Sequence, residues 1–146
     1  MTRYAETTKE PVERTKHEIE QALKRYGADQ FISGWEQGRA MLGFRAQQRH
    51  IRFELALPVA DGRNKVKAEQ QTRQRWRALL LVIKAKLEAV ESNISTFESE
   101  FLAHIVLPNN QTVGQALVPQ LAQMYETRKM PPLLGPAADD PGGKQS

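Results

Sequence analysis

Two consecutive hairpins in this sequence require the same strand register, and that agreement restricts the possible folds more than any other feature of the chain. If Gln37–Gly38 is a two-residue turn, Leu42 faces Ser33 on the strand before it. If Gln47–Gln48 is the next turn, Leu42 also faces Phe53 on the strand after it. A one-residue slip would move the apolar residues to the wrong face. In this register, one face collects Phe31, Trp35, Ala40, Leu42, Phe44, Ile51, Phe53 and Leu55.

The sequence therefore predicts a three-stranded antiparallel meander over about residues 29–36, 39–46 and 49–57. The same register leaves Arg45 and Arg52 on the outer face of the sheet, which we expect to be basic. Gln–Gly is a fair sequence for a tight hairpin turn and Gln–Gln is a poor one, so a longer second loop remains an alternative.

A long helix is predicted over about residues 67–91, after a loop at 58–64. Its apolar stripe consists of Trp76, Leu80, Ile83, Leu87, Val90 and Ile94, with Leu79 beside it. The opposite side is also apolar or small, with Ala78, Leu81, Val82, Ala85 and Ala89. A helix that is apolar all round is buried on two sides. We expect the second side to be covered within the chain or by a second copy, as in a homodimer through this central helix.

Residues 1–10 are polar, and we expect them to form an extended or mobile N-terminal segment. Pro11 suits the first turn of a helix, where its missing N–H costs nothing. This first helix is predicted to run to about Tyr26, with Gly27 ending it.

Two shorter helices are expected near the C-terminus. Ser95–Glu98 has a capping-box pattern and predicts a helix to about His104. Thr112–Gln115 repeats the pattern and predicts a helix to about Tyr125, with a kink or a late start caused by Pro119.

Together these elements predict an α+β fold: an N-terminal helix, a three-stranded antiparallel meander, a long central helix and two shorter C-terminal helices packed on one sheet face. The 146 residues fit one domain with a core of its own, which we place at residues 11–134. Residues 135–146 are rich in Pro, Gly and Asp, and we expect a disordered tail there.

Charge is distributed unevenly along the chain. Residues 39–86 contain twelve basic and three acidic residues, a net charge of +9, whereas residues 88–126 contain five acids and no Lys or Arg. A field of this kind attracts polyanions or acidic protein surfaces. Basic side chains that converge from several elements are what contacts with phosphates require. The predicted nucleic-acid-binding residues are Arg45, Arg49, Arg52, Lys65, Lys67, Arg73, Arg77 and Lys84.

The alternative is that these eight residues only solubilise exposed faces of the protein. Their charge is accompanied by no recognition motif. The aromatic residues of the meander belong to its inner face, so they form core rather than a stacking platform for bases. Contacts to the DNA or RNA backbone, without base recognition, are therefore the form of nucleic-acid binding that we expect.

Other chemistry has little support in the sequence. The chain has no cysteine, which excludes disulfides and thiolate ligands. His17 lies near Glu13 and Glu20 at helical spacing, but ordinary charge pairs explain this pattern. Glu88 and Glu91 read as a solvated acidic face. No phosphate loop, dinucleotide fingerprint or nucleophile elbow occurs. We therefore expect a non-enzymatic protein with no catalytic residue, cofactor or metal.

Four runs of the sequence carry a family resemblance: TTKEPVERTKHEIEQALKRYGADQF, GWEQGRAMLGFR, RQRWRALLLVIKAKLEAVES and TFESEFLAHIVLPNNQTVGQAL. Over about residues 4–134 the chain resembles a family of small uncharacterised proteins found in bacterial genomes and prophage-like regions. The resemblance implies a bacterial or phage protein of the cytoplasm. It implies no activity, cofactor or partner.

The function expected from these observations is a binding module that contacts the nucleic-acid phosphate backbone, in phage or mobile-element biology. The alternative is a small protein-interaction or inhibitor protein that docks on an acidic surface of a larger host complex. The longest apolar run, residues 78–83, is too short to cross a membrane, so no membrane partner is expected. Met130–Leu134 pairs prolines with bulky apolar residues, and it either binds a partner groove or packs back on the domain.

Overall fold

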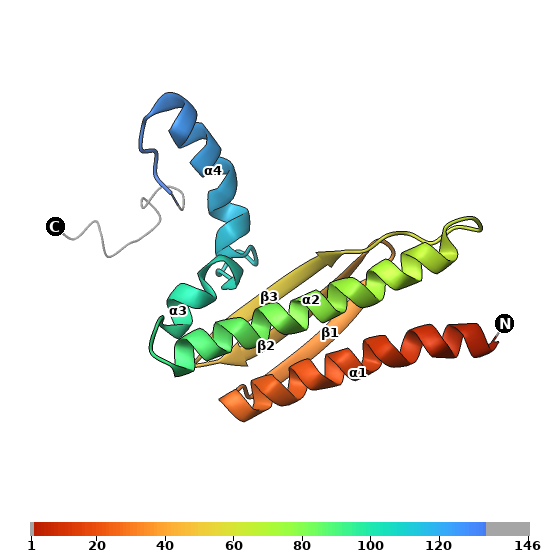
Figure 1. The fold of residues 1–146 in the computed structure, drawn as a ribbon. Coiled ribbons are helices and arrows are strands. Elements are labelled where there is room, and N and C mark those ends of the chain that lie inside the picture. The colour runs from red at the N-terminus through yellow and green to blue at the C-terminus, as the bar shows by residue number, and fades with distance from the viewer. Residues whose placement is uncertain (1, 134–146) are drawn as a thin grey trace.

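The computed structural model describes residues 2–133, with side chains from Pro11 onward, and it has a mixed helix and sheet architecture. Two long helices lie side by side over one face of a three-stranded antiparallel sheet (Figure 1). The predicted α+β class is confirmed, and the tail predicted at 135–146 lies outside the described residues. The elements are α1 (Thr2–Tyr26), β1 (Gln30–Glu36), β2 (Arg39–Ala46), β3 (Arg49–Ala56), α2 (Lys65–Glu91), α3 (Phe97–Glu100), the 3-10 helix η1 (Leu102–His104) and α4 (Val113–Thr127).

Both predicted strand registers are confirmed. Leu42 of β2 pairs with Ser33 of β1 and with Phe53 of β3. The second turn is a two-residue turn, because Gln47 and Gln48 both adopt left-handed backbone conformations, with φ of 50° and 65°. A tight turn with positive φ at both central residues twists in the same sense as the strands, so the pairing imposes it despite the unfavourable sequence. The alternative of a longer second loop is therefore wrong.

The core lies between the inner sheet face and the helices. Leu42 is 1% exposed and Phe53 is 5% exposed, whereas Arg45 and Arg52 are only partly buried on the opposite face. The helices and the α3 region contribute these buried residues to the hydrophobic core: Ile19, Ala22, Leu23, Trp76, Leu79, Leu80, Ile83, Leu87, Phe97 and Phe101. Alternation with a period of two thus separates the two sheet faces as predicted.

Trp35 is a correction to this inner-face set, because its side chain is 78% exposed. It pairs with Ala40, as expected, but β1 is an edge strand and Trp35 lies one residue before the end of it. Alternation determines the face on which a residue stands. It does not determine whether the side chain is covered there.

The predicted apolar stripe of α2 is buried from Trp76 to Leu87. Ile94 is exposed, because it lies beyond the end of the helix and so no longer follows the stripe. The opposite side of α2 is also exposed: Leu81 is 57% exposed and Val82 is 44% exposed. Burial of α2 on two sides is therefore not achieved by the residues that the structure describes.

Helix α1 begins at Thr2, so the prediction of an extended segment over residues 1–10 is wrong from Thr2 onward. Pro11 lies inside the helix rather than at its first turn. A proline removes one main-chain hydrogen bond and disfavours helix in the residue before it, but it does not forbid a helical turn on its N-terminal side. The mobility of this segment stays a prediction.

The C-terminal part differs from the prediction in two places. The first cap is Thr96, whose side chain accepts a hydrogen bond from the Ser99 N–H, and Glu98 of the predicted capping box bonds elsewhere. The second capping box is confirmed, with Thr112 and Gln115 bonded reciprocally, and α4 then continues through Pro119. However, no side chain of α4 is buried and the helix projects away from the sheet (Figure 1), so its predicted packing on the sheet is wrong.

Candidate functional site

The sequence-predicted arginines of the sheet are already bonded to carboxylates. Arg45 makes a two-atom contact with Asp29, at 2.9 Å from Nε to Oδ1 and 2.5 Å from Nη2 to Oδ2. Arg49 bonds to Glu98 through Nε and Nη2, at 2.9 and 2.6 Å. The Arg45 contact is forked, with two nitrogens on two carboxylate oxygens, whereas both Arg49 bonds end on Oε2 of Glu98. Hydrogen bonds between charged groups are stronger than those between neutral ones.

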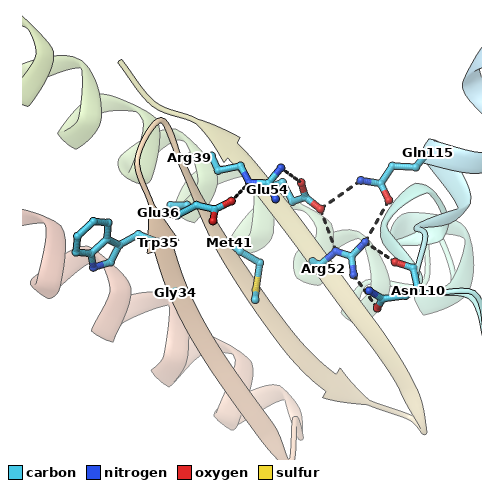
Figure 2. A pocket seen from close by; sticks show the side chains of 10 residues that line it. Gly34, Trp35, Glu36, Arg39, Met41, Arg52, Glu54, Asn110 and Gln115 are labelled. Carbon is cyan, nitrogen blue, oxygen red and sulfur yellow. Dashed lines mark hydrogen bonds and ion pairs between the residues drawn. The ribbon is translucent and has the colours of Figure 1, made fainter. Parts of the chain in front are cut away.

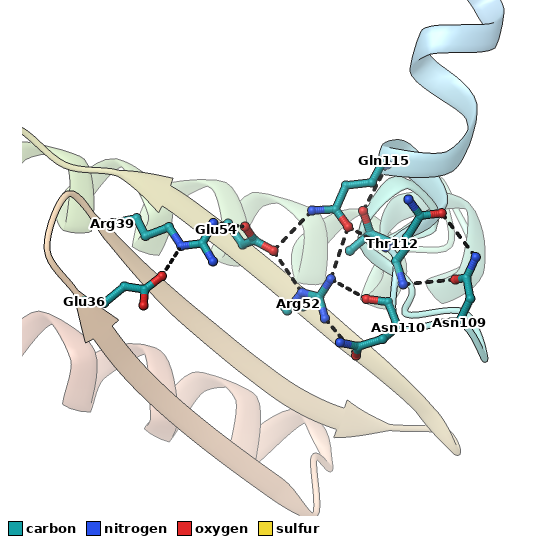
Figure 3. Close-up of polar contacts among 9 residues, drawn as sticks. Glu36, Arg39, Arg52, Glu54, Asn109, Asn110, Thr112 and Gln115 are labelled. Carbon is teal, nitrogen blue, oxygen red and sulfur yellow. Dashed lines mark hydrogen bonds and ion pairs between the residues drawn. The ribbon is translucent and has the colours of Figure 1, made fainter.

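Arg52 is the centre of a polar network that attaches the α3–α4 region to the outer face of the sheet (Figure 3). Its guanidinium donates to Glu54 at 3.1 Å and to both the side chain and the carbonyl oxygen of Asn110. It also donates to Gln115 at 3.1 Å, and the Gln115 amide in turn donates to Glu54 at 3.2 Å. The planar guanidinium of an arginine carries five N–H donors in fixed directions. Arg52 uses them to connect β3 to Asn110 and Gln115 of the α3–α4 region.

A shallow hollow lies beside this network on the outer face (Figure 2). Arg39 closes one side of it, with its Nε 2.8 Å from Glu36 and its Nη1 3.8 Å from Glu54. Trp35 borders the hollow but points away from the Arg52 network. The hollow therefore contains polar groups that already satisfy each other.

The outer face of the sheet is consequently not the basic surface that the sequence predicts. Its arginines at positions 39, 45 and 52 are each paired with at least one carboxylate, from Asp29, Glu36 or Glu54. Asp29 lies just outside β1, and the pairing of Arg45 with it joins residues 16 positions apart. A count of charges along the sequence detects no such compensation, because it requires knowledge of which residues meet.

The remaining predicted cations lie on α2, which packs on the other face of the sheet (Figure 1). Arg77 is bonded to Glu18 of α1 at 3.3 Å. Lys65, Lys67, Arg73 and Lys84 form no ion pair with any residue of the described part of the chain. The eight predicted residues therefore form two groups on opposite sides of the sheet rather than one continuous patch.

The turn before α2 adds a cation that the predicted set omitted. The Asp61 carboxylate accepts hydrogen bonds from the backbone N–H groups of Asn64 and Arg63, and these bonds lower the pKa of Asp61. This turn places Arg63 immediately before Lys65 and Lys67. The available signal was that Arg63 belongs to the basic run of residues 39–86.

Two further pKa shifts follow from the contacts. The hydrogen bond and charge of Arg45 lower the pKa of Asp29. Burial lowers the pKa of His104, and the positive charge of Lys86 lowers it further. His104 stacks on Phe53 with ring centroids 4.1 Å apart, so it is part of the packing.

Among residues 11–133, no three His, Asp or Glu side chains are close enough together to hold a metal ion. None of the helices within residues 2–133 is sufficiently long and apolar to cross a bilayer. No protein-family model, curated protein or solved structure matches this chain. We therefore infer function from the geometry and charge of its residues.

Proposed function

We propose that the chain is a non-enzymatic binding module that contacts nucleic-acid phosphates through the cations of α2. The observation that supports this proposal is the free state of Lys65, Lys67, Arg73 and Lys84, which have no carboxylate partner among the described residues. Arg63 extends the group beyond the start of the helix. We call Lys65, Lys67, Arg73 and Lys84 the free quartet.

The physical reason for preferring the free quartet is the cost of competition. A phosphate that approaches Arg45 or Arg49 has to displace a carboxylate that accepts two hydrogen bonds from the arginine. A phosphate that approaches a free lysine displaces only water and releases a counterion from the polyanion. The other four predicted cations, Arg45, Arg49, Arg52 and Arg77, form the paired quartet.

The two quartets provide a matched experiment, because replacing either one by glutamine removes four positive charges. Labelled single- and double-stranded DNA and RNA would be titrated with the wild type and with glutamine variants of each quartet, at several salt concentrations. We expect the free-quartet variant to lose most of its affinity and to reduce the salt slope by up to about four, at roughly one per phosphate contact. We expect the paired-quartet variant to keep most of the affinity, provided that its thermal melt shows a folded protein.

Three results would contradict this proposal. The first is the absence of wild-type binding at about 50 mM salt, where a backbone-contacting protein binds strongly. The second is an equal loss of affinity for nucleic acid in the free-quartet and paired-quartet variants. The third is tight binding restricted to one sequence, because contacts to the backbone alone tolerate all sequences.

A second candidate function, a protein-interaction or inhibitor module, is favoured by α4. Residues 105–125 contain no charged residue, and no side chain of α4 is buried. Val118, Leu121 and Tyr125 are exposed on this helix at helical spacing. Amphipathic helices bind grooves of other proteins through an exposed apolar face of this kind. The segment after α4 returns toward it, since Gln120 donates a hydrogen bond to the Leu133 carbonyl oxygen.

Salt and nuclease treatment distinguish the two functions. A protein partner held by apolar contact stays bound after nuclease digestion and at high salt, and it is lost when Val118, Leu121 and Tyr125 are all replaced by glutamine. A nucleic-acid complex is lost under the first two treatments and is insensitive to these three substitutions. The bulky apolar residues of α4 and the free quartet of α2 are separate, so each set serves as the control for the other.

A further inference from the structure

The exposed side of α2 carries a short apolar stripe with no covering element in the described chain. Ala78, Leu81, Val82 and Ala85 are all exposed and recur at the spacing of one helix face. This stripe lies on the side of α2 opposite to Trp76, Leu80, Ile83 and Leu87, which are buried in the core. Large exposed apolar residues at the middle of a 27-residue helix mark a contact surface rather than a solvated one.

The pattern of small and large residues in this stripe is the same when it is read from either end of the helix. Alanines occupy both outer positions, and the larger Leu81 and Val82 occupy the centre. Two copies of such a stripe fit each other when the helices run antiparallel about a two-fold axis. Ala78 of one copy then meets Ala85 of the other, and Leu81 meets Val82 on either side of the two-fold axis, so each contact occurs twice. The small alanines allow the two helices to approach closely.

The charges beside the stripe favour the same orientation. Arg77 and Glu88 lie on one flank of it, beyond opposite ends of the stripe, and Lys84 lies slightly farther round the helix. An antiparallel pair brings Glu88 of one copy beside Arg77 of the other, as a second carboxylate next to Glu18, which bonds Arg77 at 3.3 Å. A parallel two-fold pair would instead place these flanks on opposite sides of the seam, so Arg77 and Glu88 of the two copies would not meet.

We propose that this protein forms an antiparallel two-fold dimer through the Ala78–Ala85 face of α2. The occupant of the apolar stripe is a second copy of the chain, because the stripe and its flanking charges are complementary to themselves. The dimer does not depend on the nucleic-acid proposal, since Leu81 and the two alanines are outside the free quartet. It leaves Arg63 and Lys65 of the two copies at opposite ends of the paired helices.

The chain has no cysteine, so single introduced cysteines report directly on the pairing. We expect Leu81→Cys to form a covalent dimer under mild oxidation. Ala85→Cys alone should not crosslink, because the two-fold axis separates its two copies along the helices by about 10 Å at 1.5 Å per residue. A mixture of Ala78→Cys and Ala85→Cys chains should form mixed disulfide dimers. Crosslinking of Ala85→Cys to itself would indicate a parallel pair and overturn the proposal.

Charge substitutions provide a second test by light scattering across a range of concentrations. Leu81→Glu should give a monomer, while Leu121→Glu on α4, at a similarly exposed leucine, should leave the dimer intact. Arg77→Glu and Glu88→Arg should each weaken the dimer, and the double variant should restore it. Thermal melts would verify that every variant is folded. A monomeric wild type at all concentrations, a dimer lost in Leu121→Glu, or no recovery in the double variant would each overturn the proposal.

Discussion

Leu80 and Arg77 lie three residues apart on α2 and have opposite environments. Leu80 is 1% exposed at the centre of the core, whereas the Arg77 side chain is largely exposed and bonded to Glu18 at 3.3 Å. We expect Leu80→Ala to lower the free energy of unfolding by about 2–5 kcal/mol, through lost apolar burial and the cavity left behind. Arg77→Ala should cost less than about 1 kcal/mol, as exposed ion pairs do. Chemical denaturation of both variants measures the difference, and near-equal losses would contradict the assigned helix face.

His104 makes the stability of the protein depend on pH. Burial and the charge of Lys86 lower the pKa of His104 below its ordinary value of 6.5. The folded state then binds fewer protons than the unfolded state, so the free energy of unfolding falls as the pH drops through about 6.5 toward the folded pKa. We expect the melting temperature to fall less between about pH 7.5 and pH 5 in His104→Gln than in the wild type.

The matched control for this experiment is His17→Gln, because His17 is exposed on α1 and has no comparable packing. That variant should keep the wild-type dependence on pH. The comparison uses the change with pH and not the absolute melting temperature, since His104→Gln also removes the ring that stacks on Phe53. An identical pH dependence in wild type and His104→Gln would show that another group is responsible.

At the scale of secondary-structure elements, the two hairpin turns differ in a testable way. Gln48 has a φ of 65°, which glycine adopts without the steric cost that a side chain imposes. Gln48→Gly should therefore raise the free energy of unfolding by a few tenths to about 1 kcal/mol, even though glycine also increases the entropy of the unfolded chain. Gln37→Gly in the first turn should not stabilise, because Gln37 has no positive φ. Denaturation midpoints that move in the opposite order would contradict this interpretation of the turns.

The short helices show how much an element depends on what it packs against. Phe97 and Phe101 of the α3 region are buried, and Phe101 lies edge-on to Phe44 with ring centroids 5.6 Å apart. Helix α4 has an equally clear capping box but buries no side chain. Capping chemistry therefore predicts where a helix begins, and it contains no information about whether the helix joins the core.

At the scale of the whole molecule, this difference predicts that α4 is dispensable for folding. A chain that ends after Gln115 keeps the Arg52 network and removes most of α4. We expect its free energy of unfolding to remain within about 1 kcal/mol of the wild type, since no removed side chain is buried in the core. Loss of a cooperative melt on truncation would show that α4 contributes to the stability of the domain.

The sequence alone determined the sheet and the core stripe of α2. Period-two alternation in three neighbouring strands can satisfy only one register, and Leu42 meets Phe53 as that register requires. The spacing from Trp76 to Leu87 likewise determined the buried side of the helix. These are local patterns, and residues close in sequence are sufficient to define them.

Only the tertiary structure decided which charges are free. Arg49 meets Glu98 across 49 positions of sequence, and Arg52 meets Asn110 across 58, so no local pattern relates them. The same holds for Trp35, whose exposure on an edge strand is not indicated by the alternation of apolar residues. The net charge of a segment is a property of its sequence. The charge that a partner encounters depends on which residues folding brings within hydrogen-bonding distance, because a carboxylate at that distance neutralises a cation before any ligand arrives.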